Sequence, residues 1–136
     1  MAERAFTLVE LIVIIIIIGI LAALSLPQFE KTKEHALGNE AKANLKLIAA
    51  AEKIYRIEAT AYYPIPAGSQ SDISQINTYL RLSLPSGATR NWNYSVTGAA
   101  GTFSSTGSRT SGSYSSCQYS INQSEDDPVV AGGTCP

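Results

Sequence analysis

The stretch FTLVELIVIIIIIGILAALSLPQF, residues 6–29, decides the fold of this 136-residue chain. Of the sixteen residues from Leu11 to Leu26, fourteen are apolar, and the exceptions are Gly19 and Ser25. With the apolar residues before it, the run is long enough to cross a hydrocarbon core of about 30 Å as a helix. In lipid a helix satisfies all of its own backbone groups. The stretch therefore predicts a membrane-spanning helix and excludes a soluble globular enzyme.

A removable secretory signal peptide is the alternative interpretation of the same stretch. Arg4 would supply its basic start, and the small residues around Ser25 would supply a cleavage site. The apolar run is longer than that of an ordinary signal peptide, and the apolar stretch contains an acidic residue, Glu10. Both features favour the membrane helix.

Glu10 is the most informative residue of the stretch. An acidic side chain inside a membrane helix costs about 2.5–3.5 kcal/mol on insertion scales and marks a candidate functional residue. Residues 6–29 contain no Lys, Arg or His that would neutralise it. Cleavage before Phe6 would supply a cation, because the new α-amino group is largely protonated near neutral pH. That amine would lie one helical turn from Glu10 and would serve Glu10 of its own chain or of a neighbour.

Three parts of this region together resemble the N-terminus of type IV pilins and the related pseudopilins. They are the stretch AFTLVEL at residues 5–11, the apolar run with Gly19, and the sequence LPQF at residues 26–29. The family usually has glycine before its cleavage site, where this chain has Ala5. This departure leaves cleavage expected, with slower processing as its possible consequence.

The resemblance implies a processing and assembly role for these residues. A membrane-embedded prepilin peptidase would remove the leader, residues 1–5, between Ala5 and Phe6 and methylate the new amine of Phe6. Glu10 occupies the place of the family's assembly residue. In assembled filaments of the family, the backbone between a glycine and a proline placed like Gly19 and Pro27 loses helical order.

A helical pattern continues beyond Pro27. Apolar residues recur at spacings of three or four and line one face; they are Leu37, Ala41, Leu45, Ile48, Ala51, Tyr55, Ala59 and Tyr62. This predicts an amphipathic second half of the same helix over residues 30–63, which needs a partner to cover its apolar face. Pro27 predicts a kink, because it lacks a backbone N–H, and Gly19 is a second weak point.

Residues 64–136 are expected to form a globular head. Ser71 or Asp72 is suited to cap a short helix that runs through Leu80. Beyond it, alternation of apolar and polar residues predicts two strands with one buried face, around residues 92–96 and 117–121.

Phe103 and Val129–Val130 are candidates for one or two further strands. Of the nineteen residues from Gly98 to Ser116, fourteen are Gly, Ser or Thr, and this stretch is expected to be mostly loop. A small antiparallel sheet packed on the amphipathic half of the helix gives an α+β fold. It corresponds to the lollipop shape of the resembled family.

Cys117 and Cys135 are the two cysteines of the chain. An even pair in an extracytoplasmic domain predicts a disulfide. Closing a loop of this length would contribute about 3 kcal/mol in the chain-entropy model.

Metal binding and catalysis find little basis in the sequence. Glu125, Asp126 and Asp127 are weak candidates for calcium ligands, but their spacing matches no calcium loop, and acidic runs are usually solvated. His35, the one histidine, has no nucleophile motif around it. We therefore expect no enzyme activity and no cofactor. The net charge of −1 gives no indication of nucleic-acid binding.

The leading hypothesis is a structural subunit that polymerises into an extracellular type IV pilus-like filament. Before assembly it would be a single-pass protein of the inner membrane, surrounded by lipid. Its partners would be further copies of itself, the prepilin peptidase and the inner-membrane assembly machinery. The alternative is a major pseudopilin of a type II secretion system, which forms a periplasmic pseudopilus. A third hypothesis, a monomeric membrane-anchored binding domain, predicts an uncut N-terminus.

Overall fold

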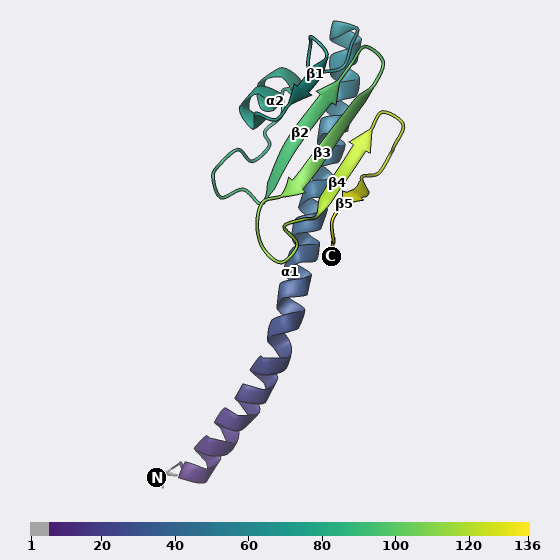
Figure 1. Ribbon diagram of the computed structural model, residues 1–136. Coiled ribbons are helices and arrows are strands. Elements are labelled where there is room, and N and C mark those ends of the chain that lie inside the picture. The colour runs from purple at the N-terminus through teal and green to yellow at the C-terminus, as the bar shows by residue number, and fades with distance from the viewer. Residues whose placement is uncertain (1–5) are drawn as a thin grey trace. The chain divides into compact units, whose positions relative to one another are not determined.

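A computed structural model describes residues 6–136 of the chain (Figure 1). The elements follow in the order α1 (Leu8–Ala59), β1 (Gly68–Gln70), α2 (Ile73–Leu80), β2 (Trp92–Gly98), β3 (Phe103–Arg109), β4 (Gln118–Asn122) and β5 (Val129–Gly132). The predicted α+β class is confirmed. The chain divides into two compact units, one up to Glu34 and one from His35 onward.

The first unit contains the N-terminal part of α1. The helix is continuous through both Gly19 and Pro27, so the kink predicted at Pro27 does not interrupt it. The polar side chain at Ser25 is accommodated within the helix, because its hydroxyl donates to the carbonyl of Leu21 at 2.8 Å. Such back-bonding lets a hydroxyl sit in an apolar helix without an outside partner.

The second unit contains a five-stranded antiparallel sheet. Its spatial order is β1-β2-β3-β4-β5, so every strand pairs with its neighbour in sequence. The longest pairing joins β2 and β3, from Trp92 opposite Arg109 to Gly98 opposite Phe103. The two strands predicted from alternation correspond to β2 and β4, and Val129–Val130 lie in β5 as predicted.

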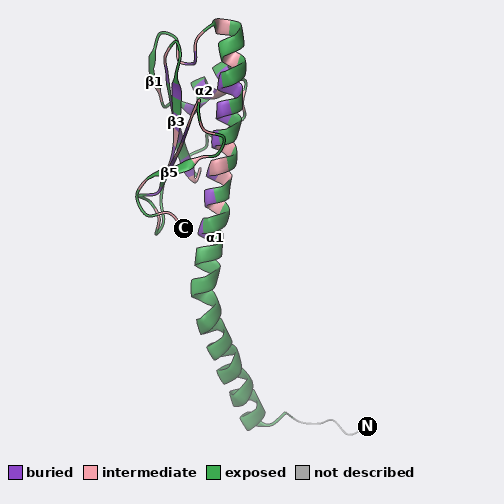
Figure 2. Ribbon diagram, turned by 90° about the vertical axis from the view of Figure 1, so that its right-hand side faces the viewer, coloured by how far each residue is buried: buried purple, intermediate pink, exposed green. Residues whose placement is uncertain are grey.

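Within this unit, α1 from His35 onward covers one face of the sheet (Figure 2). Two side chains of β2 bind the helix directly. The indole Nε1 of Trp92 donates to the carbonyl of Leu37 at 2.8 Å, and the hydroxyl of Tyr94 accepts from Asn44 at 2.9 Å. The core between α1 and the sheet includes the buried residues Ala41, Leu45, Ile48, Ala51, Val96, Phe103, Tyr119 and Ile121.

Phe103 begins β3 as predicted, but this strand continues to Arg109, so the loop expected over most of Gly98–Ser116 is wrong for its central part. The buried side of β3 carries Phe103, Ser105, Gly107 and Arg109, so alternation is present but three of the four residues are not apolar. A side chain of the core lies too close to Gly107 for a larger residue to fit there. A Cβ at Gly107 would lie 3.2 Å from the ring of Tyr94. A strand with small inward residues therefore fits beneath the large side chains of its neighbours.

The helix α1 ends at Ala59, four residues before the predicted boundary at residue 63. Thr60 has a positive φ of 63°, which stops the helix. Tyr62 and Tyr63 are buried beyond this turn. The backbone N–H of Tyr63 donates to the carboxylate of Glu52 at 2.9 Å and so fastens the chain back onto α1.

The short helix predicted after residue 72 is α2. Asp72 is its N-cap, and the carboxylate of Asp72 accepts from the backbone N–H of Ser74 at 2.8 Å. Its apolar residues Ile73, Ile76 and Leu80 are buried. Tyr79 of the same helix is 54% exposed, and its ring stacks on that of Tyr63.

Candidate assembly site

Glu10 lies in the first turn of α1, where it forms a capping box with Thr7. The hydroxyl of Thr7 accepts from the backbone N–H of Glu10 at 3.2 Å. In return, Glu10 Oε2 accepts from the backbone N–H of Thr7 at 3.0 Å and from the Thr7 hydroxyl at 2.8 Å. The capping box satisfies two backbone donors that a helix start otherwise leaves free.

Thr7 is a residue that sequence reasoning missed. The signal was present, because Thr7-Leu8-Val9-Glu10 has the spacing of a capping box before an apolar run. The carboxylate of Glu10 is thus hydrogen-bonded within its own chain, although the segment offers it no opposite charge.

The apolar side chains that follow Glu10 are exposed. From Phe6 to Phe29, the large apolar residues have exposed fractions between 42% and 73%. The helix that contains them is long and apolar enough to cross a membrane. An uncovered apolar surface of this extent requires lipid or other helices around it. The apolar helix therefore supports membrane anchoring.

Of the residues predicted for cleavage and for loss of helical order, the structure describes Phe6, Gly19 and Pro27. Phe6 is exposed and precedes α1, whereas Ala5 lies outside the described residues. Gly19 and Pro27 are both helical. A Cβ at Gly19 would meet no atom within 4 Å, so packing within the subunit does not require glycine there.

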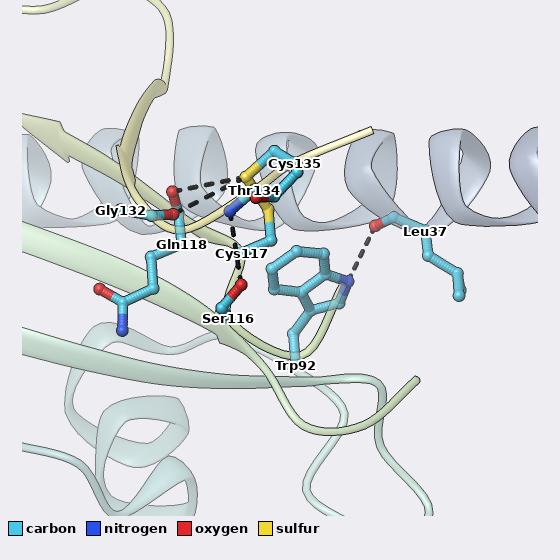
Figure 3. Close-up of a disulfide and its surroundings, with 8 residues drawn as sticks. All are labelled: Leu37, Trp92, Ser116, Cys117, Gln118, Gly132, Thr134 and Cys135. Carbon is cyan, nitrogen blue, oxygen red and sulfur yellow. Dashed lines mark hydrogen bonds between the residues drawn. A yellow bond between two sulfur atoms is a disulfide. The ribbon is translucent and has the colours of Figure 1, made fainter. Parts of the chain in front are cut away.

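Cys117 and Cys135 form the predicted disulfide (Figure 3). Cys117 precedes β4 and is fully buried, and Cys135 follows β5 close to the end of the chain. Near the bond, the backbone N–H of Thr134 donates to the hydroxyl of Ser116 at 3.4 Å. The disulfide ties the C-terminal tail and the edge strand β5 to the core.

Replacing Cys117 with serine is expected to lower the free energy of unfolding of the head by about 2–3 kcal/mol, because the unfolded chain loses a covalent constraint. Denaturant unfolding of the full chain in detergent micelles, followed by the fluorescence of Trp92, measures the change. Ser113→Ala, which removes an exposed hydroxyl from the connection that precedes Cys117, is the matched control and should unfold close to the wild type. Quantitative labelling of both cysteines as free thiols in the native protein would contradict the assignment.

The acidic side chains of the β4–β5 connection do not point to one common position where a metal ion would bind. Glu125 accepts from the backbone N–H of Asn122 at 3.0 Å, and Asp127 forms an ion pair with Lys46 of α1. Within residues 6–136, no group of three or more His, Cys, Asp or Glu side chains is placed to hold a metal ion. The weak calcium candidates Glu125, Asp126 and Asp127 are therefore not assembled into a site.

Comparison with known families identifies a motif at the start of the chain. Residues 1–26 match the model of the prokaryotic N-terminal methylation motif. This match covers the predicted leader, the cleavage site, Glu10 and the whole apolar run from Leu11 to Leu26. No solved structure matches the chain.

Curated relatives come from two kinds of assembly. The chain is 44% identical over 60 residues to the type IV major pilin protein PilA of Myxococcus xanthus, covering 44% of this chain and 27% of the relative. It is 42% identical over 60 residues to the type II secretion system core protein G of Pseudomonas aeruginosa, covering 44% and 42%. The core protein G of Klebsiella pneumoniae is 32% identical over 72 residues, covering 53% and 51%. The matches thus span between about a quarter and a half of these relatives.

Proposed function

We propose that this chain is a member of the type IV pilins and pseudopilins and the structural subunit of a type IV pilus-like extracellular filament; its methylation motif and its similarity to relatives of both kinds support this proposal. The observation that carries the proposal is the exposed apolar segment 6–29 with one acidic residue, Glu10, at its start. A helix of this kind is stable in lipid, and outside lipid it needs the helices of other copies.

Glu10 determines the register in which neighbouring subunits pack. In the unassembled subunit, the bonds from Thr7 reduce the cost of holding a carboxylate in lipid. Removal of residues 1–5 by a prepilin peptidase would create a methylated amine at Phe6. That amine is a stronger partner than a hydroxyl, because it carries a full positive charge that attracts the carboxylate in a medium of low dielectric. Pairing of this amine with Glu10 of a neighbouring subunit sets the register of the assembly.

The segment between Gly19 and Pro27 gives the assembled subunit a way to stretch. Pro27 donates no backbone hydrogen bond, and glycine disfavours helix by about 1 kcal/mol relative to alanine. Neither residue breaks α1 in the subunit. We therefore assign loss of helical order in this segment to the assembled filament.

The subunit would first reside in the inner membrane, with the head outside the cytoplasm, where the disulfide of Cys117 and Cys135 is stable. The inner-membrane assembly machinery would then extract it into the filament. A major pseudopilin of a type II secretion system is the second candidate, because two of the relatives described above are core protein G of such systems. Long surface filaments would favour the pilus; loss of protein export without surface fibres would favour the pseudopilus.

Assembled material is expected to begin at a methylated Phe6, because only cleavage gives Glu10 a nearby cation. Mass spectrometry of sheared filaments measures the N-terminal peptide, and the membrane fraction of cells without the prepilin peptidase provides the unprocessed control. Changing Ala5 to glycine restores the family's usual residue and should speed processing. An intact Met1 in assembled material would overturn the processing step, whereas an intact Met1 in a membrane fraction that forms no filaments would favour a membrane-anchored monomer.

A further inference from the structure

The face of the sheet turned away from α1 has an unusual composition. In residues 6–136 it presents nine side chains of the three longest strands, all hydroxyls or amides, without a charge or a large apolar group. The strand register arranges them in three cross-strand rows, which are Asn93–Ser108–Gln118, Ser95–Thr106–Ser120 and Thr97–Ser104–Asn122. Each of the nine is exposed or half-buried. We call this surface the outer face.

The outer face is hollowed near both ends. A depression of about 390 Å³ is lined by Asn93, Ser95 and Ser108 together with Arg90 and Ser71. The guanidinium of Arg90 is occupied there, since it donates to the side chain of Asn93 at 2.6 Å and to the carbonyl of Gly87 at 3.2 Å.

A second depression, of about 310 Å³, includes Thr97, Ser104 and Asn122 in its lining. The hydroxyl of Thr97 also bonds that of Ser69 on β1 at 3.3 Å, which extends the third row by one strand. Both depressions thus contain hydroxyl and amide groups of the outer face.

This composition limits the class of partner. A solvated protein surface ordinarily mixes charges of both signs, whereas the charges of this unit gather elsewhere, for example at Lys42, Lys46 and Lys53 of α1. A charged polymer finds no opposite charge among the nine side chains. An apolar partner finds one large apolar group beside them, Val129 of β5, which lies opposite Ser120 and is 46% exposed. Hydroxyl and amide groups both donate and accept hydrogen bonds, and so do the hydroxyls of a sugar.

We propose that the outer face binds a neutral polysaccharide. Across the strands its polar groups recur every 4.7–4.9 Å or so, and along each strand about every 6.6 Å. A hydroxyl-rich polymer would therefore meet a donor or acceptor at each step between the two depressions. A neutral polysaccharide carries no charge, and neither do the nine side chains of the outer face, so binding leaves no charge unpaired.

Binding to one copy is expected to be weak. The large aromatic rings of the sheet, Trp92, Tyr94 and Tyr119, are buried against α1, so none is available to stack on a sugar. Useful strength requires many copies side by side, because linked sites raise the overall affinity by about 10²–10⁴. This last step rests on the proposed function, whereas the binding surface itself does not.

The test uses the full chain in detergent micelles, coupled densely to beads, so that no filament is needed. The beads are incubated with three fluorescent neutral glucans, dextran, laminarin and soluble cello-oligosaccharides, and with alginate as an anionic polymer. We expect retention of at least one neutral glucan, unchanged in 0.5 M salt. Retention of alginate alone, or retention of none, would overturn the proposal.

A triple variant locates the binding. Ser95→Ala, Thr106→Val and Ser120→Ala together remove the hydroxyls of the middle row and keep the shape of the strands. We expect at least a tenfold loss of retained glucan. The control variant, Ser83→Ala with Ser86→Ala and Thr89→Val, removes three exposed hydroxyls outside the sheet and should bind like the wild type. Equal retention by the two variants, with Trp92 fluorescence unchanged, would place binding elsewhere and overturn the proposal.

Filament formation is scored separately by electron microscopy. A chain that binds glucan on beads but never polymerises would contradict the proposed function and leave the outer face as a binding surface. A chain that polymerises but binds no glucan would contradict the binding surface and leave the proposed function standing.

Discussion

The Glu10→Gln variant is expected to accumulate in the membrane at wild-type levels or above and to form few or no filaments. An amide is less costly in hydrocarbon than a carboxylate, so insertion does not suffer. Assembly does suffer, because the amine of Phe6 on a neighbouring subunit would be buried without an opposite charge. Removing one partner of a buried ion pair costs about 3–5 kcal/mol.

Filament yield after shearing, divided by the amount in the membrane fraction, measures this effect. Glu30→Gln, which removes an exposed acid just beyond the apolar segment, is the matched control and should assemble normally. Thr7→Val keeps the charge of Glu10 and removes the hydroxyl that binds it in the unassembled subunit, so the pairing with the amine is retained and filaments should still form. Normal yields from Glu10→Gln would mean that the helices polymerise by apolar packing alone.

The parts of the fold that were predictable are those with local signals. The apolar run defines α1 whatever surrounds it, and Asp72 followed by spaced isoleucines defines the start of α2. The disulfide was predictable because the chain has one pair of cysteines. The capping box of Thr7 and Glu10 was equally local and could have been found from its spacing.

The strand β3 was not predictable in the same way. Its inward residue Gly107 is small because Tyr94 and Leu45 occupy the space above it, which is a property of the assembled core. Ser105 is fully buried, and its hydroxyl donates to the carbonyl of Ser95 on the next strand at 3.1 Å. Alternation judged by hydrophobicity therefore fails where packing selects residues for size.

The end of α1 depends on a tertiary contact as well. The apolar pattern runs through Tyr62, but Thr60 adopts a positive φ and the chain turns back. The carboxylate of Glu52 receives the N–H of Tyr63 on the far side of this turn. A glutamate on a helix with many charges gives no sign in the sequence that it will be buried.

Glu52 is expected to make the head less stable as the pH rises through neutrality. Its side chain is fully buried, Oε1 has no hydrogen-bond partner among the described residues, and burial raises the pKa of Glu52 from 4.5 to about 7, although the bond from Tyr63 lowers it. The folded state therefore keeps a proton that the unfolded state releases. This stability is complete below pH 4.5 and is lost as the pH rises through 7, by about 3 kcal/mol at most.

Glu52→Gln should remove this part of the pH dependence, because an amide does not titrate. The glutamine oxygen can still accept from Tyr63, whereas its buried NH₂ group lacks a known acceptor, so the variant need not be more stable than wild type at pH 5. The decisive quantity is the change in the free energy of unfolding between pH 5 and pH 8, followed by Trp92 fluorescence. Glu58→Gln, an exposed position on the same helix, should keep the wild-type change. Equal changes in wild type and Glu52→Gln would show that Glu52 is ionised throughout, and the turn after Ala59 would then close over a buried charge.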